Sequence, residues 1–136
     1  FKKLAGSKTP TGGVKRLAER GQVQSIVGES TADLESAESY IHEVIRQAYA
    51  MASQGKRLPK EMKASLRLAA ANATHRSAAA VDRLYQAGGG SSIYEHSVLQ
   101  RCFRDIHVTT QHVMVASPIY EVVGRVNLGL NPRSLL

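Results

Sequence analysis

The sequence predicts an all-α protein, an up-and-down helical bundle that forms one domain over residues 1–136. Two observations favour this fold class. Apolar residues recur at steps of three and four along three long stretches, which is the spacing of one face of an amphipathic helix. In contrast, no stretch alternates apolar and polar residues with a period of two, so the pattern indicates no β-sheet.

The first long stretch, residues 22–54, follows a short helical tail at 1–6 and a loop at 6–13 that is rich in Gly, Pro and Thr. At 1.5 Å per residue this helix extends for about 50 Å, a length that in a small domain is typical of helical bundles. Gly55 is placed to end it. Its apolar stripe consists of Val23, Ile26, Val27, Leu34, Ala37, Ile41, Val44, Ile45, Ala48 and Met51.

Two further long helices and a short one follow. The second covers residues 60–86, with Pro59 near its first position, where proline is tolerated. The third covers residues 97–115, with Ser97 as its N-cap. A short last helix begins at Pro118. In the third helix, we expect the side chains facing the bundle to be Cys102, Phe103, Ile106 and Val113.

Composition narrows the classes of function. The formal net charge is +7, but the basic residues are scattered and no basic stripe is interleaved with aromatic residues, so the pattern does not favour nucleic-acid binding. No apolar run approaches the roughly 18 residues of a membrane span. A single cysteine excludes an internal disulfide and fits a reducing, cytoplasmic setting. The opening FKKLAG reads like a helix already under way, so we expect a piece of a longer polypeptide.

The stretch AGGGSSIY, residues 87–94, interrupts the helical pattern with three consecutive glycines. Glycines are costly to order on folding, and a simple turn needs one of them at most. The loop joins two predicted helices, so we expect its exposed N–H groups near a helix N-terminus, a place that suits phosphate or another anion. A tight corner that requires positive φ is the simpler explanation of the same glycines.

A second group of polar residues lies in LQRCFRDIHVTTQH, residues 99–112. On a continuous helix Asp105, Thr109 and His112 share one face, whereas His107 points toward Arg104 and Gln111. The histidine spacing matches no metal-ligand set, so no metal site is predicted. A serine nucleophile paired with His112 lacks the expected sequence context.

These segments resemble a known family. The sequence from Ala80 to Pro132, with its GGGS, LQR, RDIH and QH motifs, is similar to the C-terminal end of the acyl-CoA dehydrogenase superfamily. Within it the similarity is greatest to the two-component flavin-dependent monooxygenases, which hydroxylate aromatic compounds. Where the dehydrogenases carry a catalytic Glu followed by Gly-Thr, this sequence has His112, Val113 and Met114. The missing carboxylate argues against removal of an α-proton from an acyl-CoA.

The resemblance implies the C-terminal helical domain of a longer flavoenzyme that uses O₂ and FMN or FAD, reduced by a separate reductase. It also implies a homo-oligomer, a tetramer, and a small aromatic substrate. By analogy Gly89, Gly90 and Ser91 approach the flavin, Lys8 stands where an arginine commonly contacts the flavin phosphate, and His112 exchanges a proton during catalysis. Two alternatives stay open: an acyl-CoA dehydrogenase-like oxidoreductase, and a non-catalytic helical module for oligomerisation.

Overall fold

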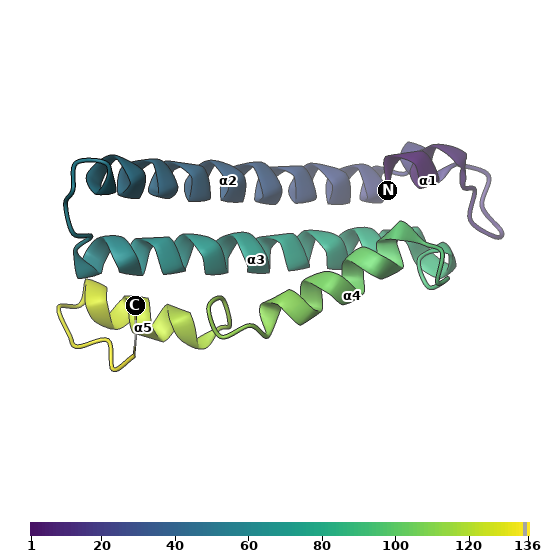
Figure 1. Cartoon of the computed structure of the whole chain (residues 1–136). Helices are drawn as coiled ribbons and strands as arrows, with labels where there is room; N and C mark the ends of the chain where they lie inside the picture. Colours follow the sequence, from purple (N-terminus) through teal and green to yellow (C-terminus); the bar gives the residue numbers. More distant parts are fainter. Residues whose placement is uncertain (135) are drawn as a thin grey trace.

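The computed structural model describes residues 1–134 and 136, and this part of the chain contains five α-helices, two short 3₁₀ turns and no strand. Helices α2 and α3 are antiparallel neighbours, and α4 and α5 follow one another along the other side of α3 (Figure 1). The predicted all-α, up-and-down architecture is therefore confirmed. The elements are α1 (Lys2–Ser7), η1 (Leu17–Glu19), α2 (Gly21–Ala52), α3 (Lys60–Gly88), η2 (Gly89–Ser91), α4 (Val98–Thr110) and α5 (Pro118–Asn127).

Helix α3 is the central element, since it packs against α2, α4 and α5. Its buried side chains are all small, and small side chains let neighbouring helices approach closely on more than one side. These buried alanines are Ala64, Ala69, Ala71, Ala78 and Ala80. Against the first part of α3, the α5 residues Ile119, Val123 and Val126 form an apolar core with Ala64 and Ala71.

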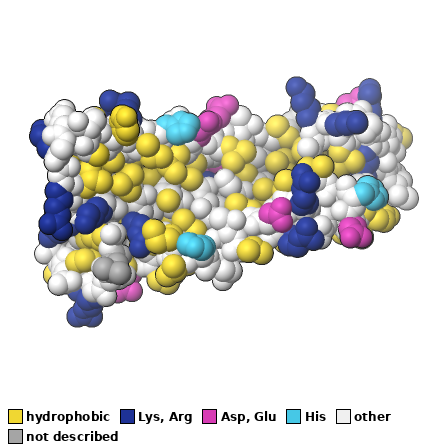
Figure 2. Space-filling view, in the orientation of Figure 1, with side chains coloured by type: hydrophobic (Ala, Val, Ile, Leu, Met, Phe, Trp, Pro, Cys, Tyr) yellow, Lys and Arg dark blue, Asp and Glu magenta, His cyan; other side chains and the backbone are white. Residues whose placement is uncertain are grey.

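Helix α2 buries a narrower stripe than its sequence predicts. Four of its buried residues recur every seventh position, at Val23, Ser30, Ala37 and Val44, as expected for a helix that contacts a single partner. The flanking members of the predicted stripe stay exposed, with 41% for Val27, 41% for Leu34 and 48% for Ile45. Figure 2 shows hydrophobic side chains lying open on the face of the molecule that is turned toward the viewer in Figure 1.

An ion-pair cluster joins α2 to α3 across their interface. The Asp33 carboxylate, 17% exposed, accepts hydrogen bonds from Arg76 at 2.5 Å and from Arg83. The Arg83 hydrogen bond lowers the pKa of Asp33 below its ordinary value of 3.8, and Arg76 adds to this effect, although partial burial acts in the opposite direction. Asp33 is therefore charged, and bonded to both arginines, at neutral pH.

Helix α4 ends at Thr110, earlier than the predicted end at residue 115. The Thr110 hydroxyl donates to the carbonyl of His107 at 2.8 Å. The N–H groups of Gln111 and His112 donate to the carbonyls of Val108 and Thr109, three residues earlier in the chain, as in a 3₁₀ turn. Such side-chain bonds compete with the regular helical ladder. The prediction that Val113 faces the bundle is wrong, because Val113 is 78% exposed, while Cys102 is half-buried.

Candidate functional site

The first two of the three glycines are explained by the fold itself. A Cβ on Gly88 would lie 2.2 Å from Ser92 Oγ and 3.0 Å from Leu99 Cδ1. Ser92 is fully buried and donates its hydroxyl to the carbonyl of Tyr85 at 2.7 Å, so it cannot readily move away. Gly89 has φ 54° and ψ −147°, a conformation that only glycine adopts without strain.

Neither explanation, a steric conflict at Cβ or a positive φ, applies to Gly90. Its φ lies outside the left-handed region, and no atom would lie within 4 Å of an added Cβ. Gly89 and Gly90 are both exposed; a Cβ at Gly89 would lie 3.7 Å from Lys8 Nζ, whereas the chain leaves open space beside Gly90. Glycine at position 90 is what a close approach by a molecule other than this chain would require.

Lys8 reaches this loop from the other end of the sequence. Its Nζ donates to the carbonyl of Gly88 at 2.7 Å, and its backbone carbonyl accepts the N–H of Leu17 at 2.9 Å. The ammonium group therefore bonds one of the last carbonyls of α3, where the helix dipole favours a cation. The four residues predicted to bind a cofactor, Lys8, Gly89, Gly90 and Ser91, line one cavity of about 500 Å³.

The side chains of Arg20 and Tyr94, which the sequence did not mark as ligands, also line this cavity. In the described part of the chain no acidic side chain lines the cavity, so its charge is positive. One expectation was wrong: the loop directly follows the C-terminus of α3, and α4 begins only at Val98. An anion here would bind to Lys8, Arg20 and the loop N–H groups, without a helix N-terminus.

His112 lies apart from the glycine cavity, in the connection of residues 111–117 between α4 and α5, here termed the His112 segment. Its imidazole is exposed, and Nδ1 accepts the N–H of Met114 at 3.3 Å. Because α4 has already ended, His112 does not share a helical face with Asp105 and Thr109, and that prediction is wrong. Within one chain the structure does not bring His112 and the glycine loop together.

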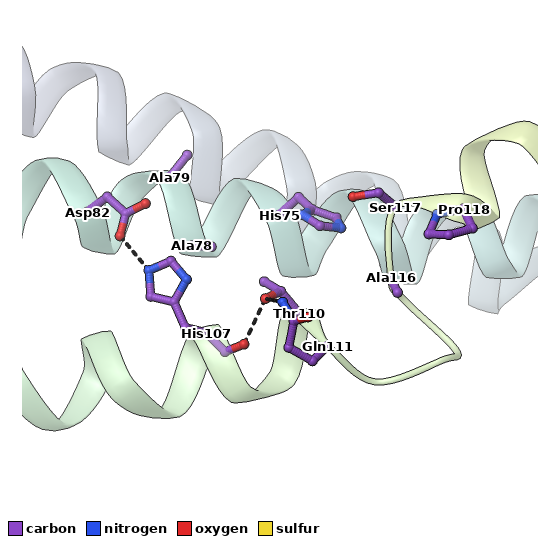
Figure 3. Close-up of a pocket in the computed structure, with 10 residues that line it drawn as sticks. All are labelled: His75, Ala78, Ala79, Asp82, His107, Thr110, Gln111, Ala116, Ser117 and Pro118. Carbon is purple, nitrogen blue, oxygen red and sulfur yellow. Dashed lines mark hydrogen bonds and ion pairs between the residues drawn. The ribbon is translucent and has the colours of Figure 1, made fainter.

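A second cavity, of about 430 Å³, lies between α3 and the His112 segment (Figure 3). His107 Nε2 lies 2.8 Å from Asp82 Oδ1, so the expectation that His107 turns toward Arg104 and Gln111 was wrong. His75 Nε2 lies 3.0 Å from the carbonyl oxygen of Val115. Periodicity could place His75 and Asp82 on α3, but only the packing of α4 and α5 gives them these partners.

Two kinds of feature are absent from residues 1–134 and 136. No three side chains among the histidines, cysteines and acids come together as a metal site. No helix in the same range is both long enough and apolar enough to cross a membrane.

Comparison with known proteins agrees with this architecture. The family model described as "Acyl-CoA dehydrogenase, C-terminal domain" matches residues 1–117. The chain belongs to this family. The helical domain and its glycine loop are therefore those of an acyl-CoA dehydrogenase C-terminal domain, as the resemblance in the sequence implied.

Relatives of this C-terminal domain include named oxygenases. It is 29% identical to indole-3-acetate monooxygenase of Pseudomonas putida over 129 residues, 95% of this chain and 33% of that protein. It is 30% identical to HsaA of Mycobacterium tuberculosis, the oxygenase subunit of a flavin-dependent monooxygenase, over 78% of this chain and 27% of that protein. The chain thus spans about a third or less of the relatives it matches.

A solved structure supports the fold. XiaF from a Streptomyces species, solved in complex with FADH₂ and glycerol, superposes with a TM-score of 0.90 over 98% of this chain and 34% of its own. The identity of 22% makes this a likeness of fold alone.

Proposed function

We propose that residues 1–136 form the C-terminal domain of a longer flavin-dependent monooxygenase and hold reduced FMN or FAD. The observation that carries this proposal is the glycine cavity, where Lys8 and Arg20 face a loop with an unexplained glycine at position 90. Both sequence relatives described above are monooxygenases, and HsaA is flavin-dependent by name. XiaF, which shares the fold, binds FADH₂.

The residues of the cavity fit the polar part of a flavin nucleotide. A phosphate would receive the charge of Lys8 and Arg20 and a hydrogen bond from a loop N–H group such as that of Gly90, whereas the N–H of Gly89 already caps α3 on the carbonyl of Gln86. The space beside Gly90 admits close approach of the ligand to the backbone. When bound, a reduced flavin supplies the activation of O₂ and the transfer of one oxygen atom.

His112 is the residue of this chain that we expect to hold and move a proton during the reaction. Its imidazole is exposed, and Nδ1 is already an acceptor for the Met114 N–H, so Nε2 is the ring atom available to an outside group. An imidazole can both accept and donate a proton, which suits reversible proton transfer. Because His112 and the glycine loop are apart within one chain, we propose that they serve different flavin sites in an oligomer.

The partners follow from the same proposal. We propose a homo-oligomer, a tetramer, and the apolar side chains of α2 that α3 leaves exposed supply surface for it. A separate reductase would supply the reduced flavin, and the substrate would be a small aromatic compound. A cytoplasmic location is consistent with the single, unpaired cysteine.

The test uses the full-length protein that contains this chain, with reduced flavin, O₂ and a panel of phenolic and indolic acids. We expect tight binding of reduced flavin and a hydroxylated product. We expect His112→Asn to lower the rate of hydroxylation by about 10²–10⁴-fold, the usual contribution of a positioned proton donor, and to lower with it the product formed per O₂ consumed. Flavin affinity should change less than threefold. Flavin reduction by an acyl-CoA would instead support the dehydrogenase alternative, and absence of flavin binding would support the oligomerisation module.

A further inference from the structure

We propose that His75 and Asp82 are positioning residues, which clamp the His112 segment onto α3 and so set the direction of the His112 imidazole. This inference rests on the proposed function of His112. The two residues lie on the same face of α3, nearly two turns or about 10 Å apart along the helix axis. One of them acts on each end of the segment.

The ring of His112 depends on the shape of its segment. The carbonyl of His112 accepts the N–H groups of Val115 and Ala116, both at 2.9 Å, and the ring Nδ1 accepts the N–H of Met114. Backbone turn and imidazole are thus one hydrogen-bonded unit. Any contact that holds Val115 in place therefore also orients the ring.

His75 provides the clamp at the C-terminal end of the segment. Its Nε2 lies 3.0 Å from the carbonyl oxygen of Val115, and since a carbonyl only accepts, the ring must carry its proton on Nε2. Tyr120 of α5 packs against the same ring, with centroids 5.8 Å apart. Figure 3 shows His75 projecting from α3 toward the connection that leads to Pro118.

Asp82 provides the clamp at the N-terminal end. Its Oδ1 accepts a hydrogen bond from His107 Nε2 at 2.8 Å, and the His107 ring packs on Phe103 with centroids 4.5 Å apart. The carbonyl of His107 in turn accepts the hydroxyl of Thr110, the last residue of α4. Asp82 thus ties the last turn of α4, from which the segment starts, to α3.

The first measurement is hydrogen exchange of the full-length protein without flavin, read by mass spectrometry on peptides that cover residues 111–117. We expect His75→Leu and Asp82→Leu to speed exchange of this segment at least tenfold. His75→Gln, which keeps a donor near the Nε2 position, and Asp82→Asn, which keeps the acceptor, should restore most of the protection. His42→Leu is the matched control, because His42 is exposed on α2 and does not line the cavity beside the His112 segment. Wild-type exchange in both leucine variants would overturn the inference.

The second measurement is a double-mutant cycle on hydroxylated product per O₂ consumed. His75→Leu should lower this ratio at least threefold in the wild type, with flavin affinity within twofold, and should lower it no further when His112 is already Asn. A further loss in the His112→Asn background would mean that His75 acts elsewhere. If His112→Asn alone leaves the ratio unchanged, the proposed role of His112 fails, whereas the exchange data still decide whether the clamp exists.

Discussion

The roles of Gly88, Gly89 and Gly90, at the end of α3 and just after it, can be distinguished by substituting each with alanine. Gly90→Ala is the informative variant. At position 90 the added methyl group meets no atom within 4 Å, and φ is outside the left-handed region. The stability of the chain should therefore stay unchanged or rise by about 0.4–1 kcal/mol, because alanine restricts the unfolded chain more than glycine does. The same methyl group occupies the space where we propose that flavin approaches.

The same substitution at the two neighbouring glycines gives the loss of stability against which Gly90→Ala is compared. Gly88→Ala forces a Cβ to 2.2 Å from the buried Ser92 Oγ, and an overpacked site of this kind costs about 1–3 kcal/mol. Gly89→Ala places alanine at φ 54° and ψ −147°, which costs about 1–3 kcal/mol of backbone strain. Both variants should thus lose stability whether or not a ligand binds.

The assay pairs urea unfolding of the 136-residue chain with flavin titration of the full-length protein. For Gly90→Ala we expect undiminished stability together with at least tenfold weaker flavin binding, equivalent to about 1.4 kcal/mol. Unchanged flavin affinity in a stable Gly90→Ala variant would refute the idea that this glycine makes room for a cofactor. Equal loss of stability in all three variants would refute the steric reasoning.

Three further outcomes are expected. Lys8→Met should weaken flavin binding and also cost about 1 kcal/mol of stability, because the Gly88 carbonyl loses its donor, and Lys8→Arg should recover most of both in the same titrations. Asp33→Asn should flatten the acid limb of a stability–pH curve: the folded pKa of Asp33 lies below 3.8, so its contribution is full above that value and is lost as pH falls through the lowered pKa. Ile119→Val should lower the free energy of unfolding in urea by about 0.5–1.5 kcal/mol, since Ile119 is 5% exposed in the core between α3 and α5. An unchanged free energy would mean that this core does not unfold together with the rest of the chain.

Much of the fold could be read from local sequence. The apolar spacing and the glycine and proline positions predicted helices at 22–54 and 60–86, and the structure has α2 at Gly21–Ala52 and α3 at Lys60–Gly88. Helices of this length are marked by many residues, so their existence does not depend on any single contact. The loop residues Gly89, Gly90 and Ser91 were also evident, because consecutive glycines are unusual wherever they occur.

Tertiary structure decided the rest. Helix periodicity cannot show that α4 ends at Thr110, because the apolar spacing is compatible with both the regular helix and the turn that replaces it, in which the Thr110 hydroxyl bonds the carbonyl of His107. That single stop moves His112 from a helical face to an exposed turn. Likewise, Lys8 and Gly88 are eighty positions apart, and His107 meets Asp82 only because α4 packs on α3. The sequence by itself determined the helices and the unusual glycines, since these depend on neighbours along the chain. Which polar groups meet depends on packing between helices, and this cannot be predicted from local spacing.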